Sequence, residues 1–219
     1  MARRLSTVPL SAVFFILMTS SCAQNAATDR TAVTGIETQQ ELENTGTVTV
    51  ILSTQMGQIT LEIDTVRAPI SATNFLHYVD EGMYAGGSFY RTVHMENQPT
   101  DSIRIEVIQA GANQTRREEI RDAIPLERTT ETGLIHLDGT ISMARSGPDT
   151  ATASFFICIG DQPSLDFGGQ RNPDGQGFAA FGRVVSDMSI VRSIQSQPAD
   201  GQSLVEPIVI HAATRMADE

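Results

Sequence analysis

Short segments in which apolar and polar residues alternate recur along most of the chain beyond residue 46. Alternation with a period of two is typical of β-strands that bury one face. The first two segments flank the turn Gln55-Met56-Gly57 and predict a β-hairpin. We expect strands at residues 47–53, 58–64, 88–93, 103–109, 141–144, 155–159, 178–185 and 204–211. The pattern therefore predicts a mainly β protein.

Two segments follow helical spacing instead. Pro69 suits the first turn of a helix, and Gly82 marks where that helix should end. Ser186 or Asp187 can cap a second helix further along the chain. The apolar positions are Ala72, Phe75, Leu76, Val79 and Met83 in the first helix, and Met188, Val191 and Ile194 in the second.

The most informative stretch is residues 139–160, where two apolar runs flank a loop of Ser, Gly, Pro, Asp and Thr. The second run, residues 155–159, is apolar without interruption, which favours a strand buried on both faces. A loop held between two buried strands is a rigid support, and rigid supports often carry functional sites.

Composition narrows the possible functions. Apolar residues make up 40% of the 219 residues, which is ordinary for a globular protein with a core. The formal net charge is −11, so the chain lacks the basic excess that nucleic acid binding requires. The four His residues are dispersed, and we predict no metal site. Cys158 lies inside an apolar run and should be a buried, inert thiol.

The first residues of the chain have the pattern of a targeting segment. Arg3 and Arg4 precede an apolar run at residues 8–18, which is too short to span a bilayer as a helix. A basic start followed by a short apolar run is typical of a secretory signal peptide, which we assign to residues 1–21. Residues 22–46 are polar and small without sustained periodicity, so we expect a disordered tether. Residues 47–219 would form the folded domain.

The small residues that lead into Cys22 resemble a bacterial lipobox, although Thr19 stands where Leu is usual. In that reading Cys22 is acylated and becomes the first mature residue, which anchors the protein to a membrane on the periplasmic side of the cell envelope. The alternative is ordinary cleavage after Ala23, which would give a soluble periplasmic or secreted protein.

A family resemblance rests on five pieces of sequence. The segment Ile-Ser-Met-Ala-x-x-Gly-Pro-x-Thr at residues 141–150, followed by Ser-Phe-Phe-Ile, resembles the signature of cyclophilin-type peptidyl-prolyl isomerases. The other four pieces occur in the family's order: Phe89-Tyr90-Arg91, Gln109-Ala110-Gly111, Leu165-Asp166 and Phe181-Gly182-Arg183-Val184. The likeness covers roughly residues 47–216.

The resemblance implies a closed eight-stranded antiparallel β-barrel capped by two α-helices. It also implies an enzyme that needs no cofactor and accelerates the isomerisation of Xaa-Pro bonds. Because the signal peptide implies export, we expect its partners to be proline-containing polypeptides of the cell envelope, whose folding it would assist. We also expect a monomer. The alternative is a non-catalytic module that holds proline peptides or a protein partner without turnover.

The resemblance also assigns residues to roles. Arg91 would stabilise the twisted peptide bond and Gln109 would bind the substrate main chain. Val107, Phe156 and Leu165 would form the apolar wall around the proline ring. The strand edge expected to pair with the peptide comprises Ala144, Arg145 and Ser146, and we expect Met143 to bind substrate as well.

The chain departs from the family pattern at several of these positions. Glu106 puts a carboxylate where a pocket wall is expected, and Arg145, Ser154 and Ser164 replace the usual Asn, Gln and Trp. The connection between Arg91 and Gln109 is also longer than the short turn that the resemblance implies. We expect Phe178, or a residue of this insertion such as Met95, to supply the missing apolar surface.

Overall fold

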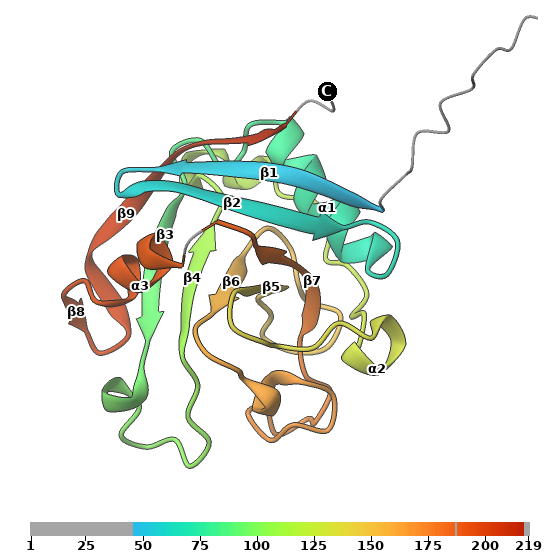
Figure 1. Cartoon of the computed structure of the whole chain (residues 1–219), viewed down its shortest axis with the longest axis vertical. Coiled ribbons are helices and arrows are strands. Elements are labelled where there is room, and N and C mark those ends of the chain that lie inside the picture. Colours follow the sequence, from blue (N-terminus) through green and yellow to red (C-terminus); the bar gives the residue numbers. More distant parts are fainter. Residues whose placement is uncertain (1–45, 187, 217–219) are drawn as a thin grey trace, which may run out of the picture. The chain divides into compact units, whose positions relative to one another are not determined.

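The computed structural model describes residues 46–186 and 188–216. Eight of its strands close into an antiparallel barrel, because β1 pairs with β2 on one side and with β9 on the other (Figure 1). The order around the barrel is β1 (Thr47–Thr54), β2 (Gly57–Asp64), β7 (Ala179–Val184), β5 (Thr140–Met143), β6 (Phe155–Cys158), β4 (Val107–Gly111), β3 (Ser88–Val93) and β9 (Ser203–Arg215). The predicted eight-stranded antiparallel barrel is therefore confirmed.

The barrel interior is filled by alternate strand residues and by side chains of the helix α1 (Pro69–Asp80). Val50 and Leu52 on β1 are fully buried, as the alternating pattern predicts. Phe75 of α1 packs edge-on against Phe155 of β6, with ring centroids 5.4 Å apart. Aromatic contacts of this geometry add to the free energy of burial.

The first predicted helix is confirmed as α1, with Pro69 in its first turn. The carboxylate of the buried Glu127 accepts hydrogen bonds from the backbone N–H groups of Ile70 (2.9 Å) and Ser71 (2.7 Å). Those N–H groups have no partner within the helix, so Glu127 satisfies them from a distant part of the chain.

The second predicted helix is α3 (Ser189–Gln195), and it contacts β2, β3 and β4. Its N-cap position is Met188, not Ser186, whose Oγ instead accepts a hydrogen bond from the backbone N–H of Thr60 (3.1 Å). Asp187 lies outside the described residues. The periodic pattern did not predict the short helix α2 (Thr129–Thr132) or the two-residue strand β8 (Ala199–Asp200).

One strand prediction is wrong at its start. Residues 103–106 belong to the connection between β3 and β4, and β4 begins only at Val107. The same connection contains the 3₁₀ turn Met95–Asn97; further 3₁₀ turns lie at Gln114–Glu119 and Pro163–Leu165.

The predictions of a signal peptide, a lipidated Cys22 and a tether concern residues 1–46, of which only Gly46 is described. Within the described ranges, every helix is too short or too polar to cross a membrane.

Candidate active site

The candidate site is built on a row of side chains that runs across four neighbouring strands. Arg91 on β3 lies opposite Gln109 on β4, Gln109 lies opposite Phe156 on β6, and Phe156 lies opposite Ser142 on β5. Residues directly opposite one another project from the same face of a sheet. The flanking row belongs to the barrel core: Phe89, Ala110, Phe155 and Met143. The row that contains Arg91 therefore lies on the outer face of the barrel.

A β-bulge brings a further polar side chain to the Arg91 end of this row. The register between β3 and β4 shifts between Phe89 and Arg91, so Tyr90 has no partner of its own. As a result Tyr90 and Arg91 both reach Gln109: the Gln109 Nε2 donates a hydrogen bond to the Tyr90 hydroxyl (2.6 Å), and its Oε1 accepts one from Arg91 Nη1 (2.7 Å). The Gln109 amide is thereby fixed in orientation.

The Arg91 guanidinium has a second anchor that the sequence did not reveal. Its Nε and Nη2 both donate hydrogen bonds to Oε1 of Gln202, at 3.0 and 2.5 Å. Gln202 lies in the turn between β8 and β9, and no motif marks it. Burial, followed by the nearby Arg171, lowers the pKa of Arg91, but an arginine remains protonated at physiological pH.

Beside this polar group lies an apolar cluster that is separate from the barrel core. It contains three residues of the predicted proline wall, Val107, Phe156 and Leu165, and these are only 2%, 4% and 1% exposed. Val93, Ile105 and Cys158 complete it, and Ala144 and Phe178 pack against it. The structure therefore brings the residues of the predicted wall together, but it also shields them from solvent.

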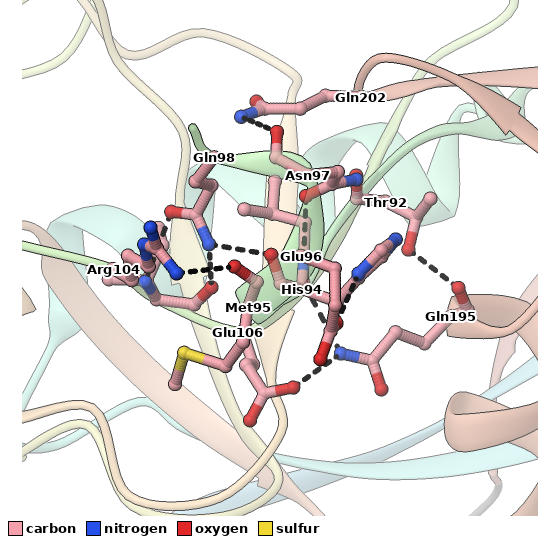
Figure 2. A network of polar contacts seen from close by, with 12 residues as sticks. Thr92, His94, Met95, Glu96, Asn97, Gln98, Arg104, Glu106, Gln195 and Gln202 are labelled. Carbon is pink, nitrogen blue, oxygen red and sulfur yellow. Dashed lines mark hydrogen bonds and ion pairs between the residues drawn. The ribbon is translucent and has the colours of Figure 1, made fainter. Parts of the chain in front are cut away.

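Phe178 lies where an additional apolar residue was predicted. Its ring packs edge-on against Phe156, with centroids 5.3 Å apart and planes at 89°. From the insertion between β3 and β4 it is Ile105 that joins the cluster, whereas Met95 is 40% exposed and is not among its members. Glu106, predicted in the wall, instead accepts a hydrogen bond from Gln195 Nε2 of α3 (3.3 Å), as Figure 2 shows.

The insertion is held in place by side-chain amides (Figure 2). Gln98 is 1% exposed and bonds the backbone of Ile105 twice, donating to its carbonyl oxygen (2.8 Å) and accepting from its N–H (3.1 Å). Asn97 donates to the carbonyl oxygens of Thr92 and Gly201, both at 3.0 Å. These bonds place Ile105 in the apolar cluster without a strand ladder.

Arg171 joins the insertion to the long loop at residues 166–177. Its Nη1 lies 3.1 Å from Asp101 Oδ2 and donates to the carbonyl oxygen of Ile103 (2.6 Å). Because the side chain is 14% exposed, this ion pair is better shielded than a typical surface pair. The insertion and the 166–177 loop are thus linked beside Arg91.

The residues predicted to bind the peptide near the end of β5 are largely engaged within the chain itself. Met143 faces the barrel core and cannot line the outer face. The N–H of Ala144 already donates to the carbonyl oxygen of Ser154 (2.9 Å), and the N–H of Ser146 donates to Thr150 Oγ1 (3.1 Å). The Arg145 side chain is only 1% exposed and binds Asp174 of the 166–177 loop.

Behind Phe156 lies a buried polar group that sequence reasoning missed. His136 stacks on Phe156 at 6.0 Å, with Nδ1 2.7 Å from Asp166 Oδ1 and Nε2 3.0 Å from Ser142 Oγ. Ser, His and Asp linked in this order are also the residue types of hydrolase triads. Ser142 is 0% and His136 1% exposed, and the stacked His136 ring supports the Phe156 ring from within the protein.

A hollow of about 340 Å³ adjoins the polar end of the row and is lined in part by Tyr90, Gly111 and Ser154. A Cβ atom at Gly111 would lie 3.1 Å from Ser154 Oγ, so glycine keeps this space open. No group of His, Cys, Asp and Glu within residues 46–186 and 188–216 is arranged to hold a metal ion.

A fixed guanidinium, a neighbouring amide and an apolar cluster thus lie together on the outside of a closed barrel. Comparison with known proteins identifies the class. The family model described as "Cyclophilin type peptidyl-prolyl cis-trans isomerase/CLD" matches residues 49–215.

Relatives and solved structures agree with this match. The chain is 35% identical over 170 residues to a peptidyl-prolyl cis-trans isomerase A of Dickeya dadantii, which covers 75% of this chain and 82% of the relative. It is also 35% identical over 148 residues to a peptidyl-prolyl cis-trans isomerase of Acinetobacter baylyi, covering 67% and 71%. A cyclophilin-type isomerase of Cryptosporidium parvum has a similar fold, with a TM-score of 0.63 at 19% identity, covering 79% of this chain and 99% of that structure. The chain therefore belongs to the cyclophilin family of peptidyl-prolyl cis-trans isomerases, a family of enzymes.

Proposed function

We propose that this protein accelerates cis–trans exchange of Xaa-Pro bonds in polypeptides of the cell envelope, with Arg91 as the catalytic residue and Gln109 as its partner. The observation that carries the proposal is the fixed contact of the Arg91 guanidinium with Gln109, one strand away from Phe156. This places a permanent cation beside the apolar wall at which a prolyl ring would dock.

Rotation about an Xaa-Pro bond makes and breaks no covalent bond, but it faces a barrier of about 18–20 kcal/mol, because the nitrogen lone pair is delocalised into the carbonyl group. In the twisted state the lone pair returns to the nitrogen. A hydrogen bond from Arg91 to that nitrogen is available only then, so it stabilises the transition state more than the ground state. The anchors on Gln109 and Gln202 hold the guanidinium ready for this role.

Substrate binding would use both halves of the site. Gln109 can donate to and accept from the peptide main chain. Val107, Phe156, Leu165 and Phe178 would surround the proline ring. A cyclophilin-type isomerase of similar fold has been solved in the presence of the dipeptide Ala-Pro, which supports a peptide ligand for this fold.

The near-complete burial of the wall supports a second candidate function. Because Phe156 and Leu165 are 4% and 1% exposed, a prolyl ring must displace Ile105 or Phe178 to reach them. If that displacement is too costly for turnover, the protein is a binding module for peptides or for a partner.

The two functions differ in one measurable respect. Two-dimensional exchange NMR on a succinylated Ala-Ala-Pro-Phe peptide, with increasing protein, reports binding and the cis–trans rate together. We expect chemical-shift changes that saturate and an exchange rate that rises with protein concentration. Saturating shift changes without faster exchange would contradict the enzyme and favour the module.

We further propose that the protein acts on the periplasmic side as a monomeric, membrane-anchored lipoprotein. Support comes from the basic and apolar start of the chain and from Cys22. Mass spectrometry of the mature protein tests this: a diacylated or triacylated Cys22 is expected, whereas an unmodified start at Gln24 would contradict it. Size-exclusion chromatography with light scattering tests the oligomeric state.

A further inference from the structure

The Arg145 side chain is committed to the chain itself rather than to solvent. It lies just after β5 and is only 1% exposed. Nη1 and Nη2 bond the two carboxylate oxygens of Asp174, at 2.8 and 2.9 Å. Nε and Nη2 also bond the carbonyl oxygen of Gly177, at 2.8 and 2.5 Å. All three nitrogens therefore bind the end of the 166–177 loop.

The loop end that receives these bonds has little freedom of its own. Asp174 Oδ1 also accepts from the N–H of Gln176 (2.8 Å). Gly177 has a φ of +69°, and a Cβ there would lie 2.5 Å from the backbone carbon of Asp166, so only glycine fits. Phe178 follows directly, and its N–H donates to the carbonyl oxygen of Leu165 (2.9 Å).

The same guanidinium also contacts the Phe178 ring. Its central carbon lies 4.9 Å from the ring centroid, within the range of a cation–π contact. The edge of that ring packs on Phe156. Contacts therefore run without a break from Asp174 through Arg145 and Phe178 to Phe156, from the loop to the predicted proline wall.

Only arginine has the chemistry for this arrangement. Its planar fork matches a carboxylate while its face stacks on an aromatic ring, whereas lysine offers a single ammonium centre. The hydrogen bond from Arg145 lowers the pKa of Asp174, as expected when a cation binds and stabilises a carboxylate. A charge as buried as that of Arg145 needs such a partner, because an unpaired buried charge is strongly destabilising.

We propose that Arg145 is a positioning residue for the proline site: it clamps the 166–177 loop through Asp174 and Gly177 and holds the Phe178 ring against Phe156. This inference rests on the proposed function for its effect on substrate, but the clamp itself does not. A wall contact is the same in the ground and transition states, so loosening it should raise KM and leave kcat nearly unchanged.

The test uses four variants of the full-length protein: Arg145→Gln, Arg145→Lys, Asp174→Asn and Arg215→Gln. Arg215 is the matched control, because it forms a similar two-pronged pair with Asp80 (2.7 and 2.6 Å) but stacks on no aromatic ring within the described residues. KM and kcat are measured with the succinylated Ala-Ala-Pro-Phe peptide. Hydrogen exchange of the Phe178 and Gly168 amides, which both bond within this region, reports loop order without any substrate.

We expect Arg145→Gln to raise KM about fivefold to tenfold, with kcat within about twofold of the original. Arg145→Lys should behave like Arg145→Gln, because lysine restores the charge but not the fork. Asp174→Asn should have a smaller effect on KM, since the side-chain amide oxygen left at position 174 and the Gly177 carbonyl oxygen can both still accept hydrogen bonds from Arg145. Exchange of the Phe178 amide should accelerate about tenfold in Arg145→Gln. Arg215→Gln should change none of these values.

The proposal is overturned if Arg145→Lys matches the unaltered protein in KM and exchange, or if Arg145→Gln changes them no more than Arg215→Gln. If Arg145→Gln does not fold, Asp174→Asn takes its place, and the proposal is overturned if Asp174→Asn changes KM and exchange no more than Arg215→Gln. If the unaltered protein shows no turnover, the proposed function fails; the peptide dissociation constant and the Phe178 exchange rate then replace KM and decide on the clamp alone.

Discussion

Replacing Gln202 with alanine tests how the Arg91 guanidinium is held. Gln202 Oε1 accepts two hydrogen bonds from the Arg91 side chain, from Nε and Nη2. In Gln202→Ala the guanidinium keeps its bond to Gln109 but can swing about it. We therefore expect the peptide to bind much as before while the transition state loses part of its hydrogen bond.

The size of the effect follows from these contacts. A hydrogen bond to a charged group contributes about 1.5–3 kcal/mol. Both bonds share one acceptor, and water can replace part of the loss at this half-buried position, which leaves a barrier increase of about 1–2 kcal/mol. That corresponds to a fall in kcat of about fivefold to thirtyfold.

The assay is the peptide exchange measurement, with circular dichroism to verify the fold. The matched control is Gln58→Ala, since Gln58 is an exposed glutamine on β2 whose side-chain hydrogen bond to Ser53 Oγ is long (3.5 Å). If kcat in Gln202→Ala stays within about twofold of the control, Gln202 does not position Arg91 and the reasoning is refuted.

Two further predictions concern buried groups. Burial, followed by the Asp166 and Asp138 carboxylates, raises the pKa of Cys158 well above its usual value. In a Cys22→Ser variant at pH 8, maleimide labelling of Cys158 should therefore be at least about 100-fold slower in native than in unfolded protein, and equal rates would contradict its burial. Glu127→Gln should lower the free energy of unfolding by about 2 kcal/mol, because it weakens two charge-assisted bonds to the start of α1. This corresponds to a fall in Tm of about 4–8 °C, with kcat/KM unchanged; a Tm within one degree would disprove it.

The barrel could be predicted because each strand buries one face, and that leaves a period of two in the sequence. The same period of two wrongly predicted a strand at residues 103–106. Ile105 alternates as a strand residue would, but the Gln98 side chain takes the place of a neighbouring strand by bonding both its N–H and its carbonyl oxygen. A pattern of apolar positions cannot distinguish these two partners.

The candidate site was predictable where a motif marks it and not elsewhere. Arg91, Gln109 and Phe156 stand in recognisable segments, and strand pairing places them in one row. Gln202 is 111 positions from Arg91, in a turn without a motif, so only the folded chain reveals their contact. His136 was one of four scattered histidines in the sequence, and its role depends on Ser142 and Asp166 meeting it behind Phe156.

Arg145 shows a different limit of prediction from sequence. The sequence placed its backbone correctly beside β5, but the direction of its side chain depends on how the 166–177 loop folds back. Glycine-rich loops have no periodicity from which that path could be read. The replacement of an expected Asn by Arg could be seen in the sequence, while its partner Asp174 could not.

The central claim is that the Arg91 guanidinium lowers the rotational barrier of a bound Xaa-Pro bond. The most direct measurement compares kcat for the succinylated Ala-Ala-Pro-Phe peptide between the unaltered protein and Arg91→Ala, with peptide affinity determined by titration in both. Loss of one transition-state donor should reduce kcat by about 100-fold or more, with a change in affinity of less than about fivefold. Equal kcat values in the two proteins would contradict the account.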